Sequence, residues 1–482
     1  IRDIGVTGVQ TCALPISYKF SPKESSESYK LMHDDSLAEL NRRLKHFAFG
    51  EIKDTALGIT TFKFPSGIKV ILKPIKTPGD EGKVYLRSKH GKYFNDLTPL
   101  QIFLRDNAAA IVAQSKLGLL SNQELKKLYK NVGIKDLTPF SYGSQFGFHA
   151  SFDVRSFEAI LQALYLYLSN ANADPESLKS QIQQFEQDRQ APKPNSQQLL
   201  YDTIAFYDLR LLPKSTVNLK ELMAIDTAVV EQYFNDKFST TVGAAYVFVG
   251  DFELNENLIS LIGRYFGSVP QRKPANGSLQ NQNDSNPNMK LPVRVVLNNG
   301  EGENSLVTVD VPGNFDGSVK EIEILNLVRD QLAFALNKRL RDKEKGTYSA
   351  FINLNLDKES KKFLLRVHFS CAPSNVDKLI RSAKDEFQKL INNPFDEDIL
   401  VSLKNNRQAK IIENISSTDF WLQYIVDEFR DSIDFSYRTG FHGIVRQKEA
   451  ISQITPFAIQ AFMKNSIDLN KADLYIQNPI QE

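Results

Sequence analysis

The chain has 482 residues, of which 41% are hydrophobic and 24% are charged, and its formal net charge is +2. The balanced charge provides no basic surface for nucleic acid or an anionic membrane. The two cysteines exclude a disulfide framework, and no apolar run approaches the ~18 residues that a membrane-spanning helix needs. The length allows about two to four domains.

The first residues of the chain look foreign to the protein. Residues 1–16 read IRDIGVTGVQTCALPI, with neither helical nor strand periodicity and no basic segment typical of a signal peptide. The string from Val6 to Ile16 resembles a sequencing adapter translated in frame. We therefore interpret residues 1–16 as an artefact, with a native tail as the alternative. On this interpretation Cys12 is not a protein cysteine, and upstream domains are expected to be missing.

Residues 17–50 are expected to be a linker and helix from the preceding region. Apolar residues at spacings of three and four predict an amphipathic helix there: Leu37, Leu40, Leu44 and Phe47. A hairpin is predicted next, because the alternating runs ITTFKF and IKVILKPI flank the turn Pro65-Ser66-Gly67.

Residues 271–290 are rich in Asn, Gln, Pro and Ser and almost free of apolar side chains, so we predict a polar linker. The linker divides the chain into blocks 51–270 and 291–482, which match one another in several segments taken in order. The strand FGFHASFDV matches FLLRVHFSC, and the helices that follow share one apolar spacing. The fold class is therefore predicted as α+β, with two homologous domains, each a mostly antiparallel sheet with helices packed on one face.

The chain shows no complete metal or nucleophile motif of its own. H-E-x-x-H, H-x-x-E-H, G-x-S-x-G and Gly-rich phosphate loops are all absent. His149 and His368 occupy equivalent places in the two blocks, and we expect half-buried strand residues with hydrogen-bond partners there rather than metal ligands. His368 and Cys371 are an odd number of residues apart on a strand, so they point to opposite faces.

The strongest local signal lies at Arg341 and Tyr348. Arg341 falls in the last turn of a predicted helix that Gly346 would cap, and Tyr348 enters the strand predicted at 349–356. A guanidinium and a phenol are donors suited to a developing oxyanion. The alternative is structural: an Arg favoured by the helix dipole and a Tyr at a sheet edge.

Several segments together resemble the insulinase/pitrilysin family of zinc metallopeptidases, the inverted zincins. They are FKFPSGIKVILKP, VFVGDFE, RLRDKEKGTYSA and FQKLINNPFDEDILVSLK. The resemblance covers residues 51–482 and implies the C-terminal half of a four-domain protein, with 51–270 as its third domain and 291–482 as its fourth. Residues 105–112, Arg-Asp-Asn-Ala-Ala-Ala-Ile-Val, carry no His or Glu, which fits a third domain that binds no metal.

The resemblance also implies roles for the two donors. In the family an Arg and a Tyr, spaced as Arg341 and Tyr348 are here, reach the active site from the fourth domain. Arg341 and Tyr348 are thus expected to be catalytic, binding the substrate carbonyl and stabilising the tetrahedral intermediate. Zinc is expected in the missing N-terminal half, with no metal and no cofactor bound to this fragment, which is expected to be inactive alone.

The leading hypothesis is the C-terminal half of a zinc metalloendopeptidase that encloses peptides or small unfolded proteins. The main alternative is a free-standing, metal-free subunit that binds peptides or pairs with a separate zinc-bearing subunit. A third interpretation is a plain scaffold with no link to peptidases. Expected partners are peptide substrates and a zinc-bearing half, without nucleic acid and without a membrane span. The compartment stays open, with the bacterial periplasm or cell envelope as one expectation.

Overall fold

The computed structural model describes residues 16–17, 31, 48–54, 57–90, 98–142, 145–169, 171–190, 196–209, 218–269, 271–272, 292–358, 360–430 and 443–480. Residues 1–15 of the range predicted to be an artefact lie outside these residues. The helix predicted from Leu37 to Phe47 and nearly all of the predicted linker also lie outside them. The described chain divides into two units, and each unit is built around one sheet.

The first unit contains an eight-stranded sheet with the order β1-β2-β3-β4-β8-β5-β7-β6. Its strands are β1 (Ile16–Ser17), β2 (Ala48–Asp54), β3 (Ile59–Lys63), β4 (Lys69–Pro74), β5 (Lys83–Lys89), β6 (Ile134–Tyr142), β7 (Gln145–Asp153) and β8 (Ala245–Gly250). The β3–β4 hairpin confirms the predicted turn at Pro65-Ser66-Gly67. All strand pairs are antiparallel except β4 with β8.

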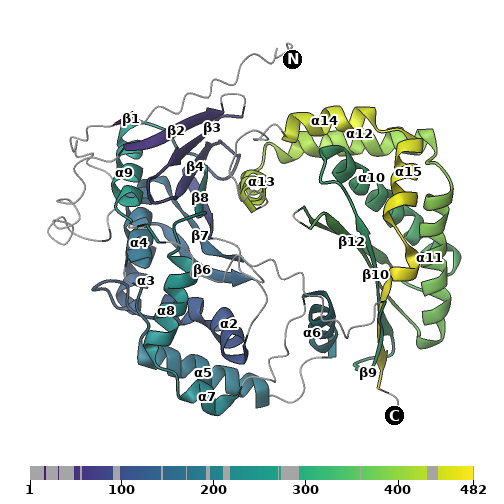
Figure 1. Ribbon diagram of the computed structural model, residues 1–482, viewed down its shortest axis with the longest axis horizontal. Helices are drawn as coiled ribbons and strands as arrows, with labels where there is room; N and C mark the ends of the chain where they lie inside the picture. The colour runs from purple at the N-terminus through teal and green to yellow at the C-terminus, as the bar shows by residue number, and fades with distance from the viewer. Residues whose placement is uncertain are drawn as a thin grey trace. The chain divides into compact units, whose positions relative to one another are not determined.

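The helices of the first unit are α2 (Pro99–Gln114), α3 (Asn122–Asn131), α4 (Phe157–Ser169), α5 (Pro175–Gln190), α7 (Leu219–Met223), α8 (Thr227–Phe238), α9 (Glu256–Gly267) and α13 (Thr418–Arg430). Several of them begin at capping side chains, among them α2, α3, α7, α8 and α9. Helix α2 starts at a capping box formed by Thr98 and Gln101, with Pro99 in its first turn. Helices α4 and α9 lie on one face of the sheet and α13 on the other (Figure 1).

The second unit contains a five-stranded sheet with the order β11-β12-β10-β13-β9. Its strands are β9 (Arg294–Gly300), β10 (Ser305–Asn314), β11 (Ala350–Asp357), β12 (Lys362–Cys371) and β13 (Asp473–Pro479). Its helices are α6 (Ser196–Leu209), α10 (Val319–Leu336), α11 (Val376–Asn392), α12 (Glu397–Asn414), α14 (Gly443–Gln453) and α15 (Pro456–Ser466). Helices α11 and α15 lie on one face of the sheet and α6 on the other (Figure 1).

Both units share one pattern of strand pairing. In the first, β4 pairs in parallel with β8, and β8, β5, β7 and β6 then follow in antiparallel pairs. In the second, β9 pairs in parallel with β13, and β13, β10, β12 and β11 follow in antiparallel pairs. The predicted α+β class with two similar, mostly antiparallel sheets is confirmed.

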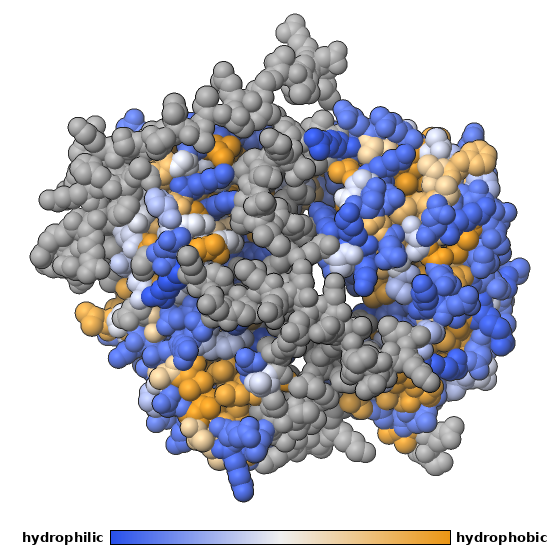
Figure 2. Space-filling model, in the orientation of Figure 1, coloured by the Kyte–Doolittle hydropathy of each residue, from blue (hydrophilic) through white to orange (hydrophobic). Residues whose placement is uncertain are grey.

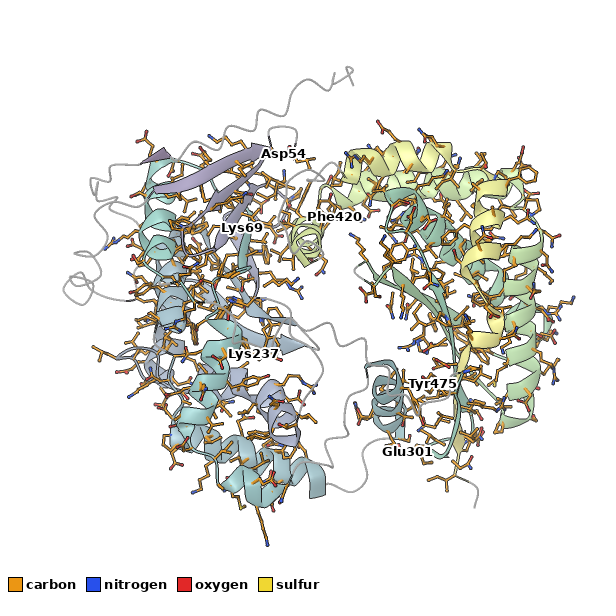
Figure 3. All side chains as sticks on the ribbon, viewed as in Figure 1. Asp54, Lys69, Lys237, Glu301, Phe420 and Tyr475 are labelled. Atoms are coloured by element: carbon orange, nitrogen blue, oxygen red, sulfur yellow. The ribbon has the colours of Figure 1, made fainter. Side chains whose placement is uncertain are left out.

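Each sheet also carries one helix that comes from the other half of the sequence. Helix α13 packs on β5 and β8, where Trp421 and Ile425 are buried, and Lys73 places its Nζ 4.6 Å from the Trp421 ring centroid. Helix α6 packs on β9 and β13, where Tyr207 and Tyr475 have ring centroids 6.0 Å apart. Figure 3 labels Tyr475 beside α6 and Phe420 on α13. In each unit the larger group of helices therefore packs on one face of the sheet, and a single helix, α13 or α6, partly covers the other face.

None of the described helices is long and apolar enough to cross a membrane. On the face drawn in Figure 2, hydrophilic side chains cover much of the described surface, and apolar side chains form smaller patches between them.

A buried histidine makes the stability of the first unit depend on pH. The His90 side chain is fully buried; its Nδ1 donates to the Thr240 carbonyl at 3.3 Å, and its Nε2 lies 3.1 Å from the Ser88 hydroxyl, which can donate to it. Burial lowers the pKa of His90 from 6.5 to about 4. The unfolded chain therefore binds more protons than the folded chain between these values, and stability falls as the pH drops from 6.5 to about 4.

The prediction concerns the slope of unfolding free energy against pH. We expect His90→Gln to flatten this slope between pH 6.5 and 4. Urea titrations at a series of pH values, followed by circular dichroism, measure it in both proteins. A variant whose slope equals that of the wild type would show that His90 does not carry this dependence.

Candidate active-site loop

The two predicted site residues lie on one connection between α10 and β11. Helix α10 ends at Leu336 and continues as a π-helical segment, Asn337–Lys343, which carries Arg341. Tyr348 follows this segment and precedes β11, which begins at Ala350. Such π-helical segments are rare and occur frequently at functional sites. We call residues 337–350 the Arg–Tyr loop.

The Arg341 guanidinium is exposed and keeps donors available. Its side chain is 52% exposed, and its Nε donates to Asp342 Oδ1 at 2.8 Å. This hydrogen bond raises the pKa of Arg341, and an electrostatic interaction with Tyr348 contributes further. Tyr348 itself is 90% exposed. The structure thus places the two predicted residues on one loop, with both side chains facing solvent.

Buried and paired side chains fix the Arg–Tyr loop to the second unit. Leu340 is fully buried beside the exposed Arg341. Glu344 accepts from Arg339 at 3.0 Å and from Lys378 of α11 at 2.6 Å. The bond from Lys378 is the largest cause of the lowered pKa of Glu344. Because this turn is already anchored, little free energy is needed to order it when the Arg341 guanidinium binds a ligand. A guanidinium on a free loop would need more.

Gly346 lies one residue beyond the left-handed position at the end of the helix. Lys345, with φ +51°, adopts the left-handed conformation that the sequence assigned to glycine. Gly346 instead approaches α11 closely: a Cβ at this position would lie 2.8 Å from both Leu379 methyl groups. Gly346 still contributes to the helix end, because its N–H donates to the Leu340 carbonyl at 3.0 Å, and its missing side chain allows the close packing against Leu379.

Asn337, which the sequence analysis missed, joins the two ends of the Arg–Tyr loop. Its Nδ2 donates to the Ala333 carbonyl and to the Ala350 carbonyl, both at 2.8 Å. Its Oδ1 accepts from the Ala350 N–H at 3.0 Å. An asparagine at the end of an apolar helical pattern gives no sequence signal of a contact with a strand that begins after the loop.

The two strand histidines differ from each other. His368 is partly buried, and its Nδ1 lies 2.9 Å from the Thr308 hydroxyl, as predicted for a strand histidine with a partner. Burial is the first cause that lowers the pKa of His368 to about 4, and Arg366 is the second. His149 is exposed, with its ring 5.8 Å from that of Phe140, so the prediction of a half-buried residue is wrong there. His149 lies on the partly uncovered face of the sheet near its edge.

The described residues do not fit a zinc ion. Among them, no group of three or more His, Cys, Asp or Glu side chains is arranged to hold a metal. In α2, Arg105 pairs with Asp106 at 2.8 Å, and Ala108 and Ala109 are buried in the core. The Arg–Tyr loop can supply charge and hydrogen-bond donors to a ligand.

Comparison with known protein families settles the kind of domain. The family model described as the peptidase M16 inactive domain matches residues 225–407. These residues include the whole Arg–Tyr loop. Residues 225–407 thus match the M16 inactive-domain model, which confirms the predicted resemblance to the insulinase/pitrilysin peptidases and is consistent with their C-terminal half. No curated protein gives a significant sequence match to the chain.

Solved structures of M16-type proteins share the fold of the whole chain. The periplasmic protease PqqL from Escherichia coli aligns with a TM-score of 0.71 and 18% identity, over 99% of this chain and 48% of PqqL. The ferredoxin protease FusC, solved with Arabidopsis ferredoxin, aligns with a TM-score of 0.72 and 13% identity, over 89% of this chain and 46% of that chain. The chain thus spans about half the length of each.

A third structure has about the same length as this chain. The M16 inactive domain from Pseudomonas fluorescens aligns with a TM-score of 0.66 and 12% identity, over 88% of this chain and 98% of that chain. At these identities the comparisons establish the fold alone.

Proposed function

We propose that this chain is the metal-free half of a two-half zinc metallopeptidase that encloses peptides or small unfolded proteins. In this proposal Arg341 and Tyr348 bind the carbonyl oxygen of the scissile bond. One observation supports it most: an exposed guanidinium and an exposed phenol lie on the same anchored loop, within the range that matches the M16 inactive-domain model. The chain alone is expected to be inactive.

The donor chemistry suits the stabilisation of an oxyanion. Arg341 uses Nε for Asp342, and its Nη2 lies at a longer 3.4 Å from the same carboxylate, so part of the guanidinium fork remains for a ligand. The Tyr348 hydroxyl adds a neutral donor. Donors held toward an oxygen that gains charge stabilise the transition state more than they stabilise the bound substrate. Each such donor typically raises kcat by ~10²–10³-fold.

Zinc would come from the other half in this proposal. The described residues of this chain offer no ligand set, so the hydrolytic step is assigned to a zinc-bearing half. PqqL is a periplasmic protease about twice as long as the aligned region, which supports both a two-half arrangement and the expectation of a bacterial periplasm.

A second candidate is a separate metal-free subunit. The Pseudomonas fluorescens M16 inactive domain, crystallised without the rest of a peptidase, is compatible with a chain of this length that folds alone. Both candidates require a zinc-bearing half as partner. They differ in whether that half belongs to the same polypeptide, and the genomic DNA upstream of the codon for Ser17 distinguishes them.

Reconstitution tests the proposed function. The chain is purified alone and together with the zinc-bearing half that the upstream or neighbouring gene encodes. We expect the chain alone to bind no stoichiometric zinc and to leave a quenched fluorescent peptide intact, whereas the assembly hydrolyses the peptide and loses activity with a chelator. Hydrolysis by the chain alone, or an assembly no faster than the zinc-bearing half alone, would contradict the proposal.

A further inference from the structure

The Asn337 carboxamide connects the parts of the chain that hold the two donors. Asn337 begins the π-helical segment that carries Arg341, and its partner Ala350 begins β11 directly after Tyr348 and Ser349. Through one side chain, the end of α10 is joined to the start of β11. The spacing between Arg341 and Tyr348 depends on how these two ends are held.

Every polar atom of this carboxamide is used. Both Nδ2 hydrogens have acceptors, the carbonyl oxygens of Ala333 and Ala350, and Oδ1 accepts the Ala350 N–H. The bond to the Ala350 N–H fixes which end of the amide carries oxygen, because an NH₂ group cannot accept that hydrogen. The side chain therefore pairs with the Ala350 backbone as a neighbouring strand would.

The Arg–Tyr loop has other anchors that do not involve Asn337. Leu340 is buried in the core, and Glu344 pairs with Arg339 and Lys378. These contacts hold the π-helical segment and the turn, while Tyr348 lies between the turn and Ala350. Loss of the Asn337 bridge is thus expected to loosen the Tyr348 end of the loop without unfolding the unit.

We propose that Asn337 is a positioning residue that holds Arg341 and Tyr348 at the relative positions needed to bind one peptide carbonyl oxygen. The inference rests on the proposed function of these two donors. Asn337 acts through them and makes no contact with the substrate. A displacement of about 1 Å in a catalytic group can cost ~10²-fold in rate, so a bridge between the two donors matters for catalysis even where it adds little stability.

The test uses Asn337→Ala in the assembled peptidase. We expect kcat to fall ~10–100-fold with KM changed less than about twofold, because the donors act in the transition state. In a protein that already carries Arg341→Ala and Tyr348→Phe, the same substitution is expected to have almost no further effect on kcat. Asn337→Asp keeps the acceptor for the Ala350 N–H but sets a carboxylate oxygen against the Ala333 and Ala350 carbonyl oxygens, so its kcat should fall at least as far as that of Asn337→Ala.

Asn326 provides a matched control on the same helix. Its Nδ2 donates to the Ile322 carbonyl at 3.1 Å, the same local bond that Asn337 makes to Ala333, with no bond to β11. Asn326→Ala should leave kcat within about twofold. Hydrogen exchange adds a local readout: the Ala350 amide should exchange faster in Asn337→Ala and at the wild-type rate in Asn326→Ala.

The outcomes separate this inference from the proposed function. Wild-type kcat in Arg341→Ala and Tyr348→Phe would overturn the function of the donors and this inference with it. Strong losses in those variants, together with wild-type kcat in Asn337→Ala, would overturn the positioning role alone. An Asn337→Ala effect that persists in full in the Arg341→Ala/Tyr348→Phe background would also overturn it, because Asn337 would then act by another route.

Discussion

Replacing Arg341 by alanine in the assembled peptidase is expected to lower kcat by ~10²–10³ and to leave the zinc content unchanged. The side chain is about half exposed and bonds only to the neighbouring Asp342 among the contacts that the structure describes, so its loss removes a donor and little packing. Steady-state kinetics with a quenched peptide and metal analysis of the same preparations measure both quantities.

Arg294 is the matched control for this prediction. It lies in the same unit, is 51% exposed, and pairs with Asp377 at 2.9 Å, much as Arg341 pairs with Asp342. Arg294→Ala should retain wild-type kcat. Arg341→Lys keeps the charge but loses the planar fork, so partial activity is expected. Wild-type kcat in Arg341→Ala, or equal losses in Arg294→Ala, would remove Arg341 from the mechanism.

Replacing Arg407 by methionine is expected to destabilise the second unit by about 3–5 kcal/mol. Arg407 of α12 donates to Glu323 of α10 through Nε at 2.8 Å and Nη2 at 3.3 Å, and the Glu323 side chain is fully buried. Methionine preserves much of the volume but leaves a buried carboxylate without its cation. Urea unfolding followed by circular dichroism measures the change in free energy.

The double variant Glu323→Met/Arg407→Met is the control for this ion pair. Removing both charged groups also removes the desolvation cost of burying them, so stability should recover most of the loss. A double variant as unstable as Arg407→Met would show that the cost came from packing. A stable Arg407→Met would show that Glu323 finds another partner or becomes protonated.

Local patterns in the sequence predicted the secondary structure well where each element carries its own signal. The hairpin from Ile59 to Pro74 follows from alternation around a Pro-Ser-Gly turn. Strands β7 and β12 lie where their alternating segments predicted them, and each is followed by an amphipathic helix, α4 or α11. The common strand order of the two units follows from the same repeated series of segments.

The packing of α6 and α13 against the sheet of the other sequence block could not be predicted from the sequence. An apolar stripe such as Trp421, Ile425 and Val426 shows that a helix face is buried, but it does not show against which sheet. Proximity in the chain favours the sheet of the same block, and the structure places each helix on the other sheet. The choice is made by packing between segments far apart in sequence.

The candidate site was predicted in part. The positions of Arg341 and Tyr348 on one loop follow from a helix end close to a strand start, and the structure places both side chains in solvent. The π-helical segment, the left-handed Lys345 and the Asn337 bridge were missed. The Asn337 bridge depends on a contact with Ala350, and the position of Gly346 on a close approach to Leu379, and a local pattern contains neither. The catalytic role of the two donors stays a prediction.

The most direct measurement compares two affinities of the assembled peptidase. One is for a phosphinic peptide, which resembles the tetrahedral intermediate, and the other is for the uncleaved peptide at low temperature. Isothermal titration of wild type, Arg341→Ala and Tyr348→Phe supplies the dissociation constants. If the donors act on the developing oxyanion, the variants lose affinity for the phosphinic peptide in proportion to their loss of kcat/KM and bind the uncleaved peptide as the wild type does. Unchanged affinity for the phosphinic peptide, or equal losses for both ligands, would contradict the account.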